Sequence, residues 1–500
     1  MALKAVLKRQ LLLIVLVVFA LNLTLAYRGY PGLSGFAYIS AGLCFCLVVW
    51  RSGGLGLPLV PVLATQHFLV YALPIFNRNA TLLDYPLALI DEAGFEVFVF
   101  LLAMGSSWYV GMQMLTPSRG PSHVIVAFER DSMGALRKVG IGLMVGSTAY
   151  AVVDFLRAAD FVFAIMPSGL QSIVTATVSA ASLAGFFLVS MIAGARGSST
   201  TMKALLAVSL AVNMGVALTS LLLYTVFGLV CAVSLGIFWS AGRIPWKLLI
   251  AGVAVLGFLQ IGKTDMRELY HFSGDEDQGF ETRPTTLSSL PKFYGDWFSL
   301  SLNDIGDSRS SKENEVRPKH ATLGDRIDNL QNLLYVVRSV EVERVPPLEG
   351  RTYTIIPALL APRIIWPEKP RTHEGQVMLN VYYGRQTMEE SLGTYIAWGL
   401  LPEAFGNFGP LFGALFLGAV LGLFSAWVES YTALKPLLSI EGMCAFGMLL
   451  GMATSFEMVA SVLVTSQFQA FMVTCMACLP FSRSLPLARR PDAEMAQSEL

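Results

Sequence analysis

The residues whose types and spacing could do chemistry gather between residues 351 and 413, in a stretch flanked by long apolar runs. Four prolines fix φ and remove backbone donors, so residues 357–370 are not expected to form a regular helix. We therefore predict a stiff, cationic, aromatic segment at a membrane surface, suited to an anionic lipid that bears sugars. The four prolines are Pro357, Pro362, Pro367 and Pro370, and the cations are Arg363, Lys369, Arg371 and Arg385. The other titratable residues are His373 and Glu403, and the aromatic residues are Trp366, Tyr382, Tyr383 and Trp398.

Arg363 and Lys369 lie within the prolines of the motif PRIIWPEKP. An arginine can bind a phosphate through two parallel hydrogen bonds, and a lysine binds it as a point charge. Rigid cations would stabilise the negative charge that develops on a diphosphate leaving group. The alternative is that both residues are interfacial anchors beside a tryptophan.

Further cations precede this motif. Lys263 and Arg267 follow an apolar run and are either diphosphate ligands or helix-end side chains that reach for water. Arg351 and Tyr353 in EGRTYT are weaker candidates for substrate binding. Glu403, in PEAFGNFG, is a candidate general base for a sugar hydroxyl, or else a partner for an arginine, and His373 is the second candidate base.

The sequence contains no motif for binding a nucleotide or a metal. There is no GxxxxGK[ST], no HExxH and no GxGxxG after a predicted strand. One cysteine pair, Cys475 and Cys478, has CxxC spacing, but it lies in a predicted span, where we interpret both residues as small apolar packing residues. We therefore expect no metal and no cofactor. No acidic pair accompanies a nucleotide-binding fold, so a transferase of this sequence is expected to use a lipid-linked donor.

Composition identifies the elements that must position these residues as membrane helices. Hydrophobic residues make up 54% of the 500 residues and charged residues 14%, against about 25% charged in a soluble domain. The spacing of apolar runs predicts an all-α polytopic membrane protein with about twelve spans. The predicted spans are 11–27, 32–50, 55–76, 92–115, 139–157, 171–194, 203–222, 224–241, 246–262, 410–428, 437–456 and 458–480.

The distribution of positive charge predicts the orientation. If the N-terminus is cytoplasmic, short cytoplasmic segments hold 16 of the 35 lysines and arginines and short external segments hold 3. Cytoplasmic loops carry such an excess. We therefore expect both termini inside a bacterial inner membrane and the long insert 263–409 in the periplasm.

The predicted organisation has four parts: spans 1–9 in residues 1–262, the insert 263–409, spans 10–12 in residues 410–482, and a polar cytoplasmic tail 483–500 without regular structure. Residues 322–344 have the spacing of an amphipathic helix, with Thr322 and Asp325 as its capping box. Its apolar face must pack on other loop segments or on the bilayer. Six polar groups within the predicted spans should face the interior of the bundle: Glu96, Glu441, Glu457, Gln66, His67 and Asn213.

Four segments in this order, GKTDMR, GRTYT, PRIIWPEKP and PEAFGNFGPLFG, resemble the O-antigen polymerase (Wzy-like) family of oligosaccharide repeat-unit polymerases. The resemblance implies a GT-C-like, metal-independent glycosyltransferase that acts on undecaprenyl-diphosphate-linked glycans. The polar stretch 301–321 matches no motif of that family.

These observations lead to one main hypothesis: the chain transfers a glycan from its undecaprenyl diphosphate to the non-reducing end of another lipid-linked repeat unit. Arg363, Lys369, Arg267 and Lys263 would hold diphosphates, and Trp366, Tyr382, Tyr383 and Trp398 would stack on sugars. The expected partners are the lipid bilayer and the flippase and chain-length regulator of the same pathway, with no nucleic acid. The alternatives are a lipid-linked glycan flippase or transporter and an O-antigen ligase-type transferase.

Overall fold

The structure is a computed structural model that describes residues 2–118, 120–125, 132–166, 168–195, 197–267, 269–270, 284, 286–310, 327–361, 366, 368–393, 396–455 and 457–485. It is predominantly helical, and eight of the described helices are long and apolar enough to cross a membrane. This confirms an all-α membrane protein. The number of spans, twelve, stays a prediction, although a helix overlaps each predicted span.

The helices over the predicted spans end close to the expected positions, whereas α1 and α7 begin well before residues 11 and 139, where their predicted spans begin. The third is interrupted by a π-helical turn, η1. In chain order they are α1 (Ala2–Tyr27), α2 (Leu33–Gly53), α3 (Leu59–His67) with η1 (Phe68–Ala72) and α4 (Leu73–Asn77), α5 (Leu87–Met114), α7 (Ser132–Phe155), α9 (Ser168–Gly194), α10 (Thr200–Leu218), α11 (Leu223–Ala241), α12 (Trp246–Ile261), α22 (Phe412–Thr432), α23 (Ile440–Thr454) and α24 (Ala460–Cys478).

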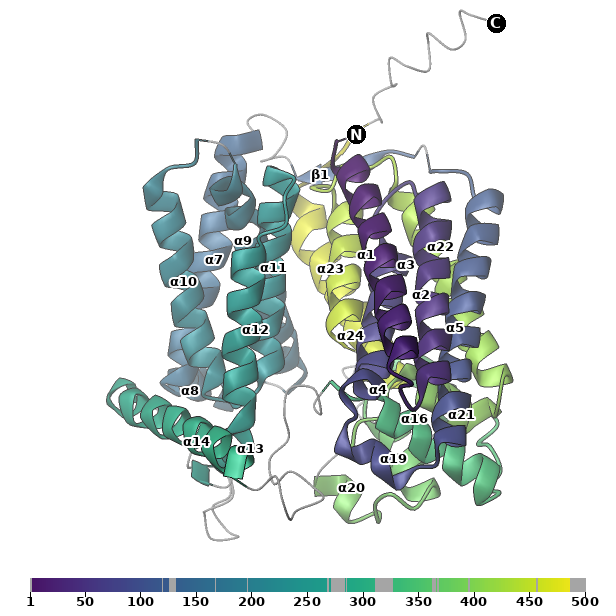
Figure 1. Cartoon of the computed structure of the whole chain (residues 1–500). Helices are drawn as coiled ribbons and strands as arrows, with labels where there is room; N and C mark the ends of the chain where they lie inside the picture. Colours follow the sequence, from purple (N-terminus) through teal and green to yellow (C-terminus); the bar gives the residue numbers. More distant parts are fainter. Residues whose placement is uncertain are drawn as a thin grey trace, which may run out of the picture.

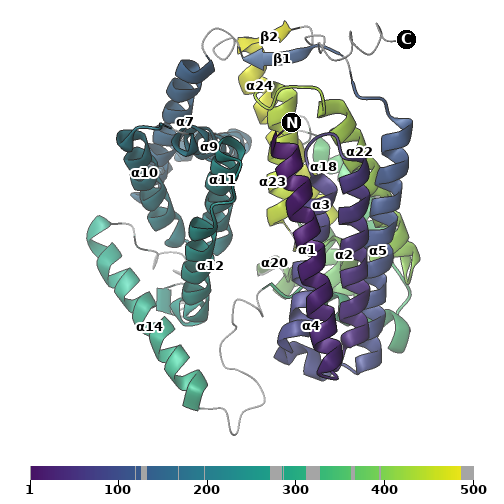
Figure 2. The same ribbon diagram turned by 45° about the horizontal axis from the view of Figure 1, so that its top comes forward.

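These helices form two groups, which Figures 1 and 2 show side by side. In the first group α5 packs between α2 and α22, and in the second α9 packs between α7 and α11. α23 contacts α3 and α22 of the first group and α11 of the second, and α24 contacts α23 and α9. Glycine allows the closest approaches, because a Cβ at Gly94 of α5 would lie 2.5 Å from Gly35 Cα in α2. Small residues commonly let membrane helices pack this closely.

The insert divides between the two groups. One part lies beneath the second group and comprises α13 (Lys263–Arg267), η4 (Leu287–Ser289) and α14 (Leu290–Ser310). The other part, described between residues 327 and 408, covers one end of the first group, and we call it the cap (Figure 1). Its elements are α16 (Leu330–Val337), η5 (Arg338–Val342), α17 (Arg351–Thr354), α18 (Ile356–Leu360), α19 (Glu374–Tyr382), α20 (Glu390–Gly393) and α21 (Leu400–Phe408).

The opposite end of the molecule holds the N-terminus and a two-stranded sheet (Figures 1 and 2). Strand β1 (Ser122–Ile125) pairs antiparallel with β2 (Ser482–Leu485), with Ser122 opposite Leu485. The predicted tail therefore begins inside a strand, which corrects the expectation of no regular structure from residue 483. The remaining short elements are η2 (Ala80–Asp84), α8 (Ala158–Ala164) and η6 (Leu479–Phe481).

The amphipathic helix of the insert differs from its prediction at the N-terminus. Residues 327–329 are not helical, and the helix begins at Leu330, where the Asp328 carboxylate accepts a hydrogen bond from the backbone N–H of Gln331. The predicted capping box, Thr322 and Asp325, lies outside the described residues. The apolar face is completely buried at Leu330, Leu333, Leu334, Val336 and Val337 and packs on α5 and α21. It is therefore a core helix of the cap.

The proline-rich stretch also differs from expectation, because residues 356–360 form the helix α18. Pro357 lies in its first turn, where a missing N–H costs no intrahelical hydrogen bond. The described residues that follow, 361, 366 and 368–370, are not helical.

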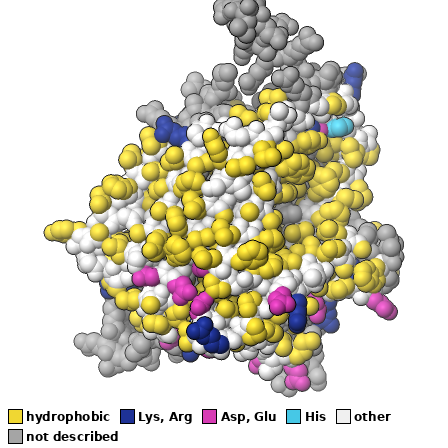
Figure 3. Space-filling model, turned by 90° about the vertical axis from the view of Figure 1, so that its right-hand side faces the viewer, with side chains coloured by type: hydrophobic (Ala, Val, Ile, Leu, Met, Phe, Trp, Pro, Cys, Tyr) yellow, Lys and Arg dark blue, Asp and Glu magenta, His cyan; other side chains and the backbone are white. Residues whose placement is uncertain are grey.

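The surface and the interior both fit a membrane protein. Figure 3 shows hydrophobic side chains over most of one face, with most Asp and Glu toward its lower end and Lys and Arg toward both its upper and lower ends. Glu96, Gln66, His67 and Asn213 are each at most 9% exposed, which confirms that these four polar groups face the interior. Glu441 and Glu457 are only partly buried, and Glu441 accepts a hydrogen bond from Lys435.

Candidate functional site

The cap is organised around the carboxyl group of Glu403, which is completely buried. Its Oε1 accepts a hydrogen bond from the Thr352 hydroxyl at 2.7 Å, and its Oε2 accepts one from the backbone N–H of Ala460 at 2.6 Å. Glu403 thus joins three elements, since Thr352 belongs to α17 and Ala460 begins α24.

One partner of Glu403, Thr352, is itself oriented by Asn407, which lies one helical turn after Glu403 in α21. The Asn407 amide donates to the Thr352 hydroxyl at 2.8 Å and to the Glu403 carbonyl at 2.8 Å. Burial raises the pKa of the Glu403 carboxyl to about 7, although its two hydrogen bonds act in the opposite direction. A carboxyl group in this range exchanges protons near neutral pH, as a general base requires.

Tyr353 lies beside this network on α17. Its ring stacks on Phe408, with centroids 5.6 Å apart, and meets the edge of Phe416. Among the described residues its buried hydroxyl has no hydrogen-bond partner. Burial, with a smaller contribution from the Glu403 charge, raises the pKa of this hydroxyl well above its ordinary value, which keeps it neutral.

Arg351 and His373 flank the same network, because α17 packs against α19. The Arg351 side chain is exposed at the start of α17. His373, at the N-terminus of α19, is partly buried, and its Nδ1 lies 2.7 Å from Gln376 Oε1. The structure therefore gathers four predicted site residues in one region: Glu403, Tyr353, Arg351 and His373.

Lys369 has a structural role in this conformation. Its Nζ donates to the carbonyls of Leu359 and Ala361, each at 2.6 Å. These carbonyls lie at the C-terminal end of α18, where a cation is favourable. Lys369 thus fixes the proline-rich segment to α18. From the sequence, Lys369 is predicted to bind a diphosphate, and these contacts with the backbone were not expected. Arg363, its predicted partner, lies outside the described residues.

The four predicted sugar-stacking side chains fall into two pairs. Trp366 and Tyr382 are 46% and 38% exposed, so their rings are accessible. Trp398 is completely buried and its indole N–H donates to Asn380 Oδ1 at 2.6 Å, while Tyr383 is buried and its hydroxyl donates to the Gly406 carbonyl at 2.7 Å. The stacking role is therefore corrected for Trp398 and Tyr383, which are core residues of the cap.

Lys263 and Arg267 are not brought to the cap. Both belong to α13, which packs on α12 and α14 at the end of the second group (Figure 1). Lys263 is only 7% exposed. Its side chain therefore does not extend from the end of the helix into water, which was the alternative prediction from the sequence.

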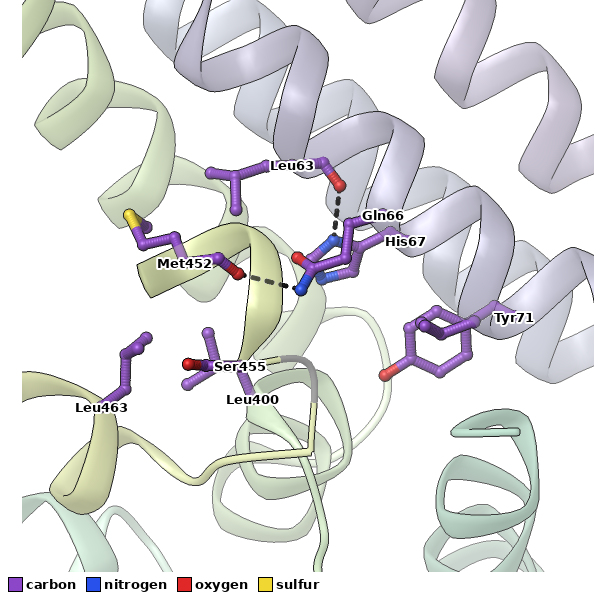
Figure 4. Close-up of a pocket in the computed structure, with 9 residues that line it drawn as sticks. Leu63, Gln66, His67, Tyr71, Leu400, Met452, Ser455 and Leu463 are labelled. Atoms are coloured by element: carbon purple, nitrogen blue, oxygen red, sulfur yellow. Dashed lines mark hydrogen bonds between the residues drawn. The ribbon is translucent and has the colours of Figure 1, made fainter. Parts of the chain in front are cut away.

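A small cavity lies inside the bundle, lined by residues of α3, η1, α21, α23 and α24. Its lining includes Gln66, His67 and Tyr71, and Figure 4 shows Gln66 and His67 beside Met452 and Ser455. The Gln66 amide donates to the Met452 carbonyl at 2.9 Å, and His67 Nδ1 lies 2.8 Å from the Leu63 carbonyl. The cavity volume, about 10 Å³, corresponds to about one water molecule and not to a sugar.

Three polar groups that the sequence did not single out are important in the structure. Thr352 and Asn407 complete the Glu403 network, and the spacing of Asn407 four residues after Glu403 on one helix face could have indicated it. Glu429, fully buried, accepts hydrogen bonds from the indoles of Trp50 and Trp108 and from two backbone N–H groups. Within the described ranges, no group of three His, Cys, Asp or Glu side chains is arranged to hold a metal ion.

The chain was compared with protein-family models, curated proteins and solved structures, and none of these three comparisons found a match.

Proposed function

We propose that this protein is a metal-independent glycosyltransferase that polymerises lipid-linked oligosaccharide repeat units at the outer face of a bacterial inner membrane. The growing glycan leaves its polyprenyl diphosphate and is transferred to the non-reducing end of another lipid-linked unit. The observation that carries this proposal is the cap, a folded polar layer on the end of a membrane bundle.

The cap supports the proposal because it combines accessible cations and aromatic rings with a proton-exchanging group. Arg351 and Trp366 are exposed and suit a phosphate and a sugar face respectively. Glu403 has a pKa near neutrality. Because Glu403 is completely buried, direct transfer from an acceptor hydroxyl requires that the cap open, and partly buried His373 needs a smaller opening.

The alternatives from the sequence differ in what they require. A flippase needs a passage for a glycan through the bundle, and the cavity at His67 gives it no support because of its size. A ligase would use the same cap with a different acceptor, so only the product separates it from a polymerase.

The test uses purified protein in liposomes with polyprenyl-diphosphate-linked repeat units, a chelator and no nucleotide. We expect a ladder of longer lipid-linked glycans by gel electrophoresis. Transport of intact units without lengthening would favour the flippase. A strict requirement for a divalent ion or a nucleotide would exclude the proposed chemistry.

A further inference from the structure

Arg385 is held rigidly in the cap by its backbone. Gly384, with φ of +69°, ends α19, its N–H donates to the Val381 carbonyl, and the N–H of Arg385 donates to the Asn380 carbonyl at 2.8 Å. This pair of hydrogen bonds is the Schellman motif, and glycine is favoured at its left-handed position. The direction in which the Arg385 side chain leaves the helix is therefore fixed.

The guanidinium of Arg385 lies between an amide and aromatic rings. Nη1 donates to Asn332 Oδ1 at 2.8 Å, and the central carbon is 5.1 Å from the Tyr335 ring centroid and 5.8 Å from that of Trp398. The Asn332 oxygen is aimed at Arg385 because its amide nitrogen donates to Asn329 Oδ1 at 2.6 Å. The surroundings of this arginine are thus preorganised.

The charge of Arg385 lacks an anionic partner. Within the described part of the chain it forms no ion pair, and burial lowers the pKa of its guanidinium. Only one of its five N–H donors has a described acceptor. Desolvated charges are normally paired, so an unpaired, partly buried arginine indicates a place for an anion.

The neighbouring groups restrict which anion fits. Tyr85 and Tyr335 are partly buried and keep accessible surface. Burial raises the pKa of both hydroxyls, and the charges of Arg385 and Arg338 act in the opposite direction. Arg338 already pairs with Glu343 at 3.2 Å. One uncompensated guanidinium matches the single charge of a carboxylate better than the multiple charge of a diphosphate.

We propose that Arg385, with the ring of Tyr335, forms a subsite for an acidic sugar, in which the guanidinium binds the sugar carboxylate and the ring contacts the pyranose. A carboxylate matches the guanidinium fork in a two-bond geometry. This inference rests on the proposed function in one respect: the acidic sugar is taken to be part of the lipid-linked repeat unit.

The test measures binding of methyl β-glucuronide and methyl β-glucoside to the purified chain by ligand-observed NMR at constant ionic strength. These probes differ in the carboxylate. A charge-assisted pair is expected to make the glucuronide bind at least about tenfold more tightly. Arg385→Gln should abolish this preference, while the matched control Arg344→Gln, another arginine of the cap, should keep it. Equal binding of both glycosides by the wild type, or a preference that survives Arg385→Gln, would overturn the subsite.

Two further measurements close the remaining outcomes. If Arg385→Gln does not fold, Arg385→Lys decides, because it keeps the charge and loses the fork, and an unchanged preference overturns the proposal. Inorganic phosphate that displaces the glucuronide at lower concentration than acetate assigns the site to phosphate and also overturns it. If the wild-type protein polymerises repeat units but does not bind the glucuronide, the subsite is overturned and the proposed function stands. If it binds the glucuronide but does not polymerise repeat units, the proposed function is overturned and the subsite stands.

Discussion

The Glu403 carboxylate and the backbone N–H of Ala460 are joined by a 2.6 Å hydrogen bond between residues 57 positions apart in the chain. Ala460 is the first residue of α24, where backbone N–H groups lack intrahelical acceptors, so a carboxylate there is favourable. This bond, with that from Thr352, makes Glu403 one of the points at which the cap is fixed to the membrane bundle.

The raised pKa of Glu403 predicts a pH dependence of stability. The folded state keeps its proton up to about pH 7, whereas the unfolded state releases it near its ordinary pKa of 4.5. The folded state therefore binds more protons in this window, and the free energy of unfolding should fall as the pH rises through it. Thermal unfolding in detergent between pH 4.5 and 8 should show this slope in the wild type and a weaker one in Glu403→Gln.

Glu403→Ala should be more severe than Glu403→Gln, because it leaves both donors without an acceptor in a buried place. Each unsatisfied group costs about 1–3 kcal/mol. A Glu403→Ala protein as stable as the wild type would contradict the central position of this carboxylate. Full polymerising activity in a folded Glu403→Gln protein would show that it is not the base and would leave His373 as the candidate.

Lys369→Met should destabilise the cap, since it removes the donors to the Leu359 and Ala361 carbonyls. We expect a loss of about 1–3 kcal/mol, measured as a lower melting temperature. The matched control is Lys292→Met, an exposed lysine of α14, which should melt as the wild type does. If Lys369→Met instead melts normally and loses activity, Lys369 acts on the substrate.

The membrane helices were predictable from the sequence because a long apolar run has one stable arrangement in a bilayer. For the same reason polar residues inside these runs, such as Glu96 and His67, were correctly expected in the interior. The π-helical turn at residues 68–72 was not expected, because no proline or glycine interrupts that segment.

Apart from α16, which lies in the predicted amphipathic helix, the cap was less predictable because its other short helices have no sustained periodicity. Trp398 and Tyr383 have the same side-chain chemistry as Trp366 and Tyr382, and only the tertiary packing of α16 and α21 decides that the first pair is buried. Likewise, the acceptors of Lys369 are backbone carbonyls. Because every residue has a backbone carbonyl, no side-chain pattern in the sequence could identify these acceptors. The partners of Glu403, Thr352 and Ala460, are far from it in the chain, so no local pattern could identify them.

The orientation of the chain is open to a direct test. The N-terminus and strand β2 lie at one end of the molecule and the cap at the other (Figure 1). With the charge distribution of the sequence, this predicts that an alkaline phosphatase fusion near Ser310 is active outside the cytoplasmic membrane and one after Arg490 is inactive. If the Ser310 fusion is cytoplasmic instead, the cap faces the wrong compartment for lipid-linked units that have already been flipped.

The last prediction concerns Arg363, which the sequence places between prolines and which we propose as the diphosphate ligand. Arg363→Lys keeps the charge but loses the planar fork, so it should fail almost as badly as Arg363→Ala. Loss of a transition-state contact of about 3 kcal/mol corresponds to a rate that is roughly a hundredfold lower in the liposome assay. In cells, single repeat units should replace long chains.

The control for this prediction is Arg371→Ala, an exposed arginine just beyond the last proline, which should cost far less activity. Protein level and insertion have to be measured for each variant, because an interfacial anchor would fail through misinsertion and not through chemistry. Arg363→Ala protein that is inserted at the normal level and still makes full-length polymer identifies Arg363 as an anchor. The diphosphate would then have to be bound elsewhere, and Arg351, exposed beside the Glu403 network, is the next cation to substitute.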